Sequence, residues 1–379
     1  MNSSSCPPRM SKVTVLRAAL AVSLLGPLRA GAQNLPQPIA VASCKDACGI
    51  TLTLEMEYGD DSGPGILDLV GWVKAYRDVS GRTYIAGEPI DNVLVFDPDG
   101  RFLRRIGRSG SGPGELKDGS SLVVTGDGEF SVLDRGRGVI LNFDHTGGFR
   151  SEVKTVGWVP HGNRTFAWNG PQAIHAADLT TSDRRGFPLH LFNVETGEIE
   201  RSFGSMTGQR ELGGNPGLHP ITVRQDRRIW MAVGFERYEI ALWDLNRPHQ
   251  LLRREASWFP EQTRNDLAHP GMGEPPQPFI YALALSEFDS LLWVLGSVAD
   301  EEWRKADLYS GDHDNFYDDI LEVIDLRTNR VIASQRFDHS YHLVEAGLLG
   351  RQAITANGSV RYQTFRVQLE ADEERCEDD

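Results

Sequence analysis

The chain has 379 residues, of which 40% are hydrophobic and 24% charged. This composition is typical of folded globular proteins and excludes disorder across the whole chain. The formal net charge is −14. Because an acidic surface repels phosphate backbones, the composition argues against nucleic acid as a partner.

The stretch 1–32 has the pattern of a secretory signal peptide. Basic residues precede an apolar stretch at 18–28, and the small residues 30–32 form a cleavage motif before Gln33. We therefore predict an exported protein, periplasmic or extracellular, in which an N-terminal segment at 33–49 precedes the folded body. Loss of four basic residues with the signal would take the net charge to −18. No other stretch approaches the roughly 20 apolar residues of a membrane span, so none is expected.

The body of the sequence repeats itself. Residues 62–67 read Ser-Gly-Pro-Gly-Ile-Leu, and residues 111–116 read Ser-Gly-Pro-Gly-Glu-Leu. A second marker, a bulky apolar residue followed by Asp or Asn, recurs at nearly even steps until the last step, which is much longer. These steps indicate a repeat architecture in which one repeat carries an insertion. The markers begin at Phe96, Phe143, Phe192, Trp243 and Ile324.

Between the markers lie short β-patterned runs separated by glycine-rich turns. Residues 121–124, 130–134 and 139–143 are three such runs. Strands of this length joined by tight turns predict consecutive antiparallel hairpins. Four such strands per repeat are typical of a β-propeller blade. Because acids recur once per repeat in the markers, we expect them to cap turns rather than to catalyse. They are Asp97, Asp144, Asp244 and Asp325.

The run from Asn92 to Gly107, followed by Gly112-Pro113-Gly114, resembles an NHL repeat. The resemblance covers residues 50–150 and fades after them, where the strand rhythm and the marker persist. It implies a six-bladed propeller. Proteins of this family are commonly ligand-binding platforms, and some lyases and lactone hydrolases are built on related propellers.

The predicted propeller body spans residues 50–370, and its last repeat has room for only three strands. Residues 50–59 alternate as a strand, with Leu52, Leu54 and Met56 on one side, and precede the first Ser-Gly-Pro-Gly motif. We therefore predict an all-β, six-bladed β-propeller with four antiparallel strands per blade, whose N-terminal strand completes the last blade. The predicted blades lie near 70–107, 118–157, 161–205, 219–258, 278–338 and 339–369, and an acidic tail follows at 371–379.

This closing strand also bears on the cysteines. If residue 50 lies opposite residue 369 in an antiparallel ladder, Cys376 falls beside the N-terminal segment, and a disulfide between Cys44 and Cys376 becomes geometrically sensible. The competing pair is Cys44 with Cys48. The fourth cysteine leaves with the signal peptide, so at least one of the three that remain is free or bonded to another chain.

Histidines near the inferred innermost strands are candidates for a metal site at the mouth of the central channel. His161, His219 and His342 lie just before or within such strands, and converging neutral imidazoles would suit Zn²⁺ or a similar ion. No close pair of histidines with ligand spacing supports this site. The competing interpretation is that they form hydrogen bonds in loops or along the channel wall.

The fifth blade contains an acidic insertion at about 299–319. Asp312, Asp314 and Asp318 have the alternate spacing of a Ca²⁺ loop, but the glycine and the terminal glutamate of an EF-hand are missing. A solvated acidic loop is the competing interpretation.

Aromatic and basic residues near the blade mouths could line a ligand groove, or they could be ordinary rim residues. Those within the insertion could belong to a lid or to a partner contact. The candidates are Arg164, Trp168, Arg184, Arg237 and Tyr238, with Trp303 and Tyr317 from the insertion.

Two functions remain open. The first is a non-enzymatic scaffold that binds a small molecule, a peptide, a glycan or a protein partner outside the cytoplasm. The alternative is a metal-dependent lyase or hydrolase at the central channel, with the three histidines as ligands. No Gly-x-Ser-x-Gly elbow occurs on a strand-to-helix turn, and the cysteines lie at the two ends of the chain, so the residues favour the scaffold. The fold alone cannot decide between the two.

Overall fold

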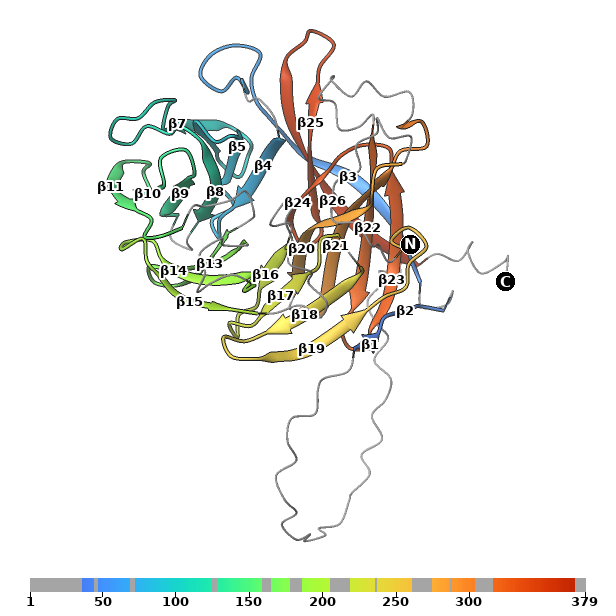
Figure 1. The fold of residues 1–379 in the computed structure, drawn as a ribbon. Helices are drawn as coiled ribbons and strands as arrows, with labels where there is room; N and C mark the ends of the chain where they lie inside the picture. Colours follow the sequence, from blue (N-terminus) through green and yellow to red (C-terminus); the bar gives the residue numbers. More distant parts are fainter. Residues whose placement is uncertain are drawn as a thin grey trace, which may run out of the picture.

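The computed structural model shows a ring of six antiparallel sheets (Figure 1). This confirms the predicted six-bladed propeller with four antiparallel strands per blade. Among the described residues there is no helix long and apolar enough to cross a membrane. The structure describes residues 36–43, 47–68, 72–124, 128–158, 165–177, 186–204, 219–235, 237–260, 275–286, 288–303 and 316–371.

Blades 1 to 3 are built from short strands in simple sequence order. Blade 1 comprises β4 (Trp72–Arg77), β5 (Thr83–Glu88), β6 (Val93–Phe96) and β7 (Phe102–Ile106). Blade 2 comprises β8 (Gly119–Val124), β9 (Phe130–Asp134), β10 (Val139–Phe143) and β11 (Phe149–Lys154). Blade 3 comprises β12 (Thr165–Asn169), β13 (Gln172–Ala176), β14 (Leu189–Asn193) and β15 (Ile199–Phe203).

Blades 5 and 6 contain the longest strands of the ring. Blade 4 comprises β16 (Ile221–Val223), β17 (Ile229–Ala232), β18 (Glu239–Trp243) and β19 (Pro248–Arg253). Blade 5 comprises β20 (Phe279–Ser286), β21 (Leu291–Ala299), β22 (Tyr317–Asp325) and β23 (Arg330–Phe337). Blade 6 comprises β24 (His342–Glu345), β25 (Leu348–Ile354), β26 (Val360–Ala371) and, from the N-terminal side of the chain, β3 (Cys48–Tyr58).

The last blade is closed by β3, which pairs antiparallel with β26. Ile50 lies opposite Leu369, so the predicted register is confirmed. The predicted burial of Leu54 is wrong, because its side chain is 52% exposed. A register shift after Leu54 also breaks the predicted alternation, so that Leu52 packs on the side of blade 5 and Met56 on the side of blade 1.

The N-terminal segment before β3 contains two further strands, β1 (Gln37–Pro38) and β2 (Ala40–Val41), which the sequence analysis does not predict. β1 pairs parallel with β19 of blade 4, and β2 pairs parallel with β23 of blade 5. Residues 37–42 therefore run between the outer strands of two neighbouring blades, and we call them the strap. Only two residues pair in each ladder, which is too short to leave a periodic signal in the sequence.

Antiparallel strands place the connections of each blade at two ends. The turn face carries the connections from the first to the second strand and from the third to the fourth. The loop face carries the connections from the second to the third strand and from one blade to the next. On the turn face, Asp144 caps the turn between β10 and β11. Its Oδ1 accepts hydrogen bonds from the backbone N–H groups of Thr146 at 2.8 Å and of Gly148 at 2.9 Å. This confirms the capping role predicted for the recurring acids.

Gly147 shows why such a turn needs glycine. Its φ is 85°, which an L side chain rarely adopts. A Cβ atom there would also lie 2.7 Å from the side chain of Ile106 in the outer strand of blade 1. The turn of one blade can therefore approach the preceding blade closely only at a glycine.

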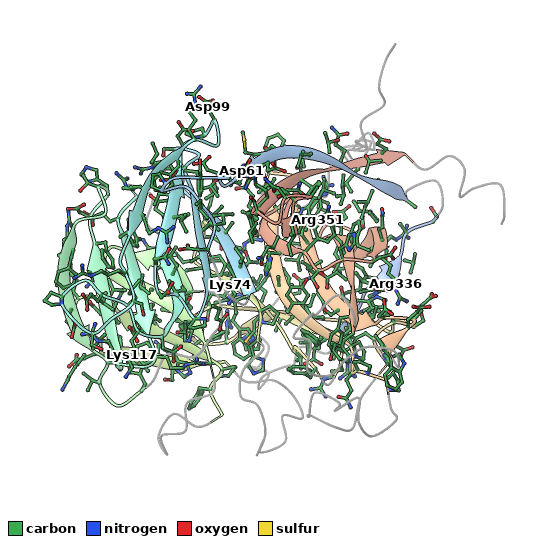
Figure 2. The ribbon with its side chains drawn as sticks, turned by 90° about the horizontal axis from the view of Figure 1, so that it is seen from above. Asp61, Lys74, Asp99, Lys117, Arg336 and Arg351 are labelled. Carbon is green, nitrogen blue, oxygen red and sulfur yellow. The ribbon has the colours of Figure 1, made fainter. Side chains whose placement is uncertain are left out.

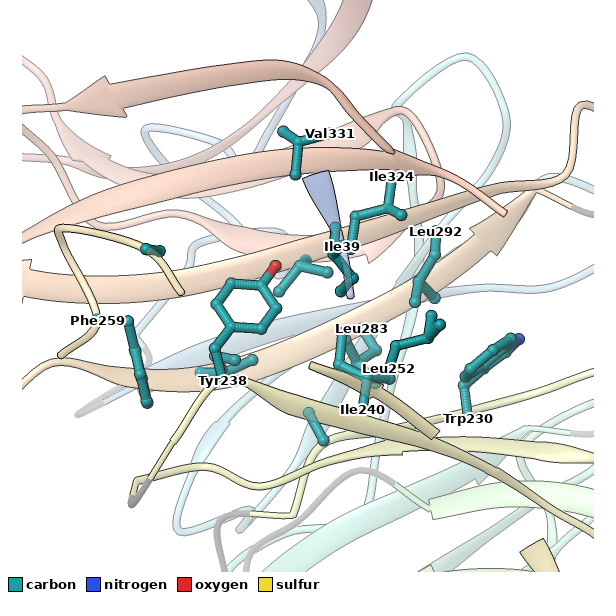
Figure 3. Packing of buried hydrophobic residues seen from close by; sticks show 14 of the residues in the cluster. Ile39, Trp230, Tyr238, Ile240, Leu252, Phe259, Leu283, Leu292, Ile324 and Val331 are labelled. Atoms are coloured by element: carbon teal, nitrogen blue, oxygen red, sulfur yellow. The ribbon is translucent and has the colours of Figure 1, made fainter. Parts of the chain in front are cut away.

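The apolar core lies between neighbouring blades. One cluster joins blades 4 and 5, where Ile240 and Leu252 face Leu292 and Ile324, all fully buried (Figure 3). Ile39 of the strap belongs to the same cluster and is 6% exposed. Burial of such side chains is the main force that holds one blade against the next.

Candidate functional site

The two faces of the ring differ in the length of their connections. On the turn face each connection is a short turn, such as 97–101 between β6 and β7. On the loop face the longest connection is 254–278, between β19 and β20, followed by 204–220, between β15 and β16, and 300–316, between β21 and β22. Because loops on a rigid scaffold commonly carry function, the loop face over blades 4 to 6 is the candidate binding face. Parts of these connections lie outside the described residues, so the strand ends beneath them define the site.

An aromatic group spans blades 4 and 5 at the loop face. Phe279, the buried first residue of β20, lies at its centre. The ring centroids of Phe235, Tyr281 and Tyr317 lie 5.5, 5.7 and 5.3 Å from that of Phe279, and these three residues are half-buried. Burial raises the pKa of Tyr317 to about 12, so its hydroxyl stays neutral at physiological pH. The group thus combines apolar area with the hydroxyls of two tyrosines.

Asp319, a fully buried residue of β22, holds one of these tyrosines in place. Its carboxylate accepts hydrogen bonds from Tyr281 Oη at 2.5 Å, Ser297 Oγ at 2.8 Å and the backbone N–H of Tyr341 at 2.6 Å. The Tyr281 hydroxyl also lies 2.7 Å from the carbonyl oxygen of Tyr341. A buried carboxylate needs such donors. Because Tyr341 directly precedes β24, these contacts tie blade 5 to blade 6 beneath the loop face.

Its neighbour Asp318 lies on the opposite side of β22, since side chains alternate along a strand. Asp318 is buried, and its carboxylate is 2.5 Å from the Arg336 guanidinium, which also donates to the carbonyl of Ala299 at 2.8 Å. Arg336 lies toward the outer side of the ring (Figure 2). Burial raises the pKa of Asp318 against the opposing effect of Arg336, and Asp300 raises it further.

A buried polar cluster lies where the outer parts of blades 4 and 5 meet. One oxygen of Glu322 accepts hydrogen bonds from Arg254 at 2.8 Å and from the Trp258 indole at 3.0 Å. Tyr238 packs against Trp258 with ring centroids 5.6 Å apart. Burial, with a contribution from Glu322, raises the pKa of Tyr238 well above its ordinary value. Tyr238 is therefore a core residue here, and contact with a ligand would require the core to open.

The other predicted ligand residues are placed variously. Arg237 donates from Nε to the buried Glu239 at 3.1 Å. Trp303 is buried, at 8% exposure, and Trp168 lies in β12. Tyr317 begins β22, so the residues from Tyr317 onward belong to a strand and not to the insertion. Of the predicted residues whose side chains the structure describes, only Tyr317 is found in the aromatic group.

The predicted zinc site falls partly outside the described residues. His219 is buried just before β16 of blade 4, and His342 is the half-buried first residue of β24 in blade 6, so blade 5 separates them. In the part of the chain that the structure describes, no three His, Cys, Asp or Glu side chains group to hold a metal ion. The zinc and calcium sites therefore stay predictions. The predicted residues outside the described ranges are His161, Arg164, Arg184, Asp312, Asp314, Cys44 and Cys376.

Sequence reasoning missed Asp319, Tyr281 and Tyr341. The sequence places Asp319 in the acidic insertion at about 299–319, because a carboxylate in a run of acids gives no sign of being buried. The tyrosines flank inferred inner strands, which is the only signal that could have marked them.

Comparisons with known proteins agree with the fold. A family model described as a 6-bladed beta-propeller, DUF5128, matches residues 68–174, from blade 1 into blade 3. A solved structure of a DUF4221 family member from Bacteroides vulgatus is similar at 11% identity and a TM-score of 0.56, covering 84% of this chain and 98% of that chain. A protein of Bacteroides fragilis described as a candidate exported protein is similar at 12% identity and a TM-score of 0.57, covering 88% and 100%. No curated protein sequence matches the chain.

The fold and these similarities define the class of the protein as a six-bladed β-propeller. At such low identity, the solved structures support the fold alone.

Proposed function

We propose that this chain is a non-enzymatic binding scaffold whose ligand docks on the loop face over blades 4 to 6. The observation that carries the proposal is the aromatic group around Phe279. It lies at the base of the connections 254–278 and 300–316, which are among the three longest of the ring, and most of its members belong to the long strands of blade 5. Rigid strands under long loops are the usual construction of a binding face.

The chemistry of the group limits the ligand. Aromatic rings supply contact area at a low cost in conformational entropy, and tyrosine hydroxyls add hydrogen bonds. Asp319 fixes the ring of Tyr281 through its hydroxyl, so that ring is pre-organised. A small molecule, a peptide or a glycan fits this surface, and we propose one of these as the ligand.

The test is a binding screen with matched variants. Purified mature protein is applied to arrays of defined peptides and oligosaccharides, and each hit is measured again with Tyr317→Ala and Phe288→Ala. Phe288 is 98% exposed on the turn face, which makes it the control. We expect Tyr317→Ala to weaken binding at least tenfold and Phe288→Ala to leave it unchanged, with both variants melting as cooperatively as the parent. Equal loss in both variants would refute a site on the loop face.

Elemental analysis of the same preparation addresses the catalytic alternative. A scaffold should carry no stoichiometric transition metal. One tightly held metal per chain, lost in His219→Ala, would instead favour the metal-dependent lyase or hydrolase.

We further propose that the protein is exported and carries a disulfide near the junction of its two ends. The similarity to a candidate exported protein supports export. Cys48 is buried at the start of β3 and lies opposite Ala371 of β26, and this position where the two ends of the chain meet supports a disulfide there. Peptide mapping under non-reducing conditions would distinguish the predicted Cys44–Cys376 bond from pairs that contain Cys48. The NHL-like run lies within the matched segment 68–174 and stays an interpretation.

A further inference from the structure

The strap lies between two blades and bonds to both. The backbone N–H of Ile39 donates to the carbonyl of Arg253 in blade 4 at 2.8 Å. The next N–H, of Ala40, donates to Asn329 in blade 5 at 3.1 Å, and that of Ala42 donates to Val331 at 2.9 Å. The strap is thus an extended segment whose two short strands join two sheets, and its hydrogen bonds are of the kind that any extended peptide can form.

One side chain anchors it. Ile39 is 6% exposed and packs with Tyr238, Leu252 and Val331, which come from the facing blades (Figure 3). Its neighbour Val41 is 67% exposed. The groove therefore selects a large apolar side chain at one position and tolerates variation two residues later.

A polar contact sets the register. The side-chain oxygen of Gln37 lies 3.2 Å from the amide nitrogens of both Gln250 and Asn329. Pro38 fits because the N–H of the following residue faces blade 4, so the proline nitrogen points away from that ladder. Polar and apolar contacts together identify an acceptor site with a preferred sequence and direction.

The strap contributes to no blade's own set of four strands. β1 and β2 precede every blade along the chain, so withdrawal of residues 37–42 breaks no ladder within any four-stranded sheet. The walls of the groove, β19 and β23, each belong to a complete blade. The groove can therefore persist when the strap leaves.

We propose that the groove between β19 and β23 is a peptide-acceptor site, and that the strap of a second copy of this chain can occupy it in place of the chain's own. The strap is the sequence shown to fit the groove, and each copy offers both a strap and a groove. Reciprocal exchange between two copies would give a closed, symmetric dimer. This inference is independent of the loop-face site.

The first test measures the acceptor site in the full chain. A labelled peptide of residues 35–43 is added to the Ile39→Asp protein, in which the strap has lost its anchor. We expect one peptide to bind per chain, and the same peptide carrying Val41→Asp to bind as well. The peptide carrying Ile39→Asp should bind at least about tenfold more weakly, because its anchor would be a buried charge. Equal binding of all three peptides, or binding of none, would overturn the acceptor site.

The second test uses the wild-type chain and so does not depend on the folding of a variant. Excess peptide should speed amide hydrogen exchange at Ile39, Ala40 and Ala42 of the protein's own strap, and the Ile39→Asp peptide should not. For the second copy, light scattering at rising protein concentration should show a dimer that excess peptide dissociates. Unchanged exchange at these amides would overturn the acceptor site. A chain that binds the peptide but stays monomeric at every concentration would overturn the exchange between copies.

Discussion

Blades 1 to 3 and blades 4 to 6 share one architecture but are held together differently. In the first half, the described residues add no further strand to β7, β11 or β15, and β11 is exposed along most of its length. In the second half, the strap pairs with the outer strands of blades 4 and 5, and β3 completes blade 6. One continuous N-terminal stretch thus fastens three blades. The candidate binding face belongs to this half, so its long loops are attached to blades that carry additional strand pairing.

The largest effect is expected when the strap and β3 are both removed. Deletion of residues 33–58 takes away the strap and β3, the outer strand of blade 6, together with buried side chains such as Ile39 and Ile50. We expect the free energy of unfolding to fall by at least about 4 kcal/mol, because several buried side chains are lost at roughly 1.5–3 kcal/mol each. Denaturant titration measures it, and deletion of residues 33–36 alone is the control. An unchanged midpoint after the larger deletion would show that β3 does not hold the ring closed.

A single substitution tests the strap alone. Ile39→Ala should lower the free energy of unfolding by about 2–4 kcal/mol, because it leaves a cavity between blades 4 and 5. The control is Val79→Ala in blade 1, where the side chain is 84% exposed, and the expected change is within about 0.5 kcal/mol. Both values come from the same denaturant titration. Similar losses in the two variants would mean that the strap adds nothing beyond an ordinary surface contact.

Blades 4 to 6 also show most clearly what the sequence could and could not predict. The pairing of Ile50 with Leu369 could be predicted, because the length of the last repeat demanded a strand and the alternation of residues 50–59 supplied one. The strap could not be predicted, because ladders of two residue pairs leave no periodic pattern in the sequence and its buried residue Ile39 is a single apolar residue in that pattern. The burial of Tyr238, which the sequence analysis names as a candidate for a ligand groove, could not be predicted for a related reason. Its burial depends on Ile39 and on blade 5, both far away in the sequence.

Asp318 gives a pH test within blade 5. Because its folded pKa is raised above the ordinary value of 3.8, the folded state binds more protons, and stability should decline as pH rises from about 4 through the folded pKa. Asp318→Asn should flatten this part of the pH profile, because the substituted side chain no longer titrates. Thermal melts at closely spaced pH values measure it. A profile unchanged by the substitution would contradict the prediction, because it would mean that folding does not raise the pKa of Asp318.

The smallest expected effect lies at the seam between blades 6 and 1, where Glu55 contacts Arg77 at 3.1 Å and also contacts Arg366. Burial alone would raise the pKa of Glu55, but hydrogen bonds from the two guanidinium groups outweigh it and lower the pKa. The seam contact should therefore stabilise the fold above about pH 4.5 and weaken as pH falls through the folded pKa, the opposite slope to that of Asp318.

Glu55→Gln should remove less than about 1 kcal/mol at neutral pH, since the charges are partly exposed, and the loss should shrink at high salt. The control is Glu198→Gln, which changes an exposed acid next to β15 of blade 3. Equal salt dependence in the two variants would show that the ion pairs of this seam add nothing to its closure. The seam would then rest on its apolar packing and on neutral hydrogen bonds such as that between the hydroxyls of Tyr58 and Thr83, 3.0 Å apart.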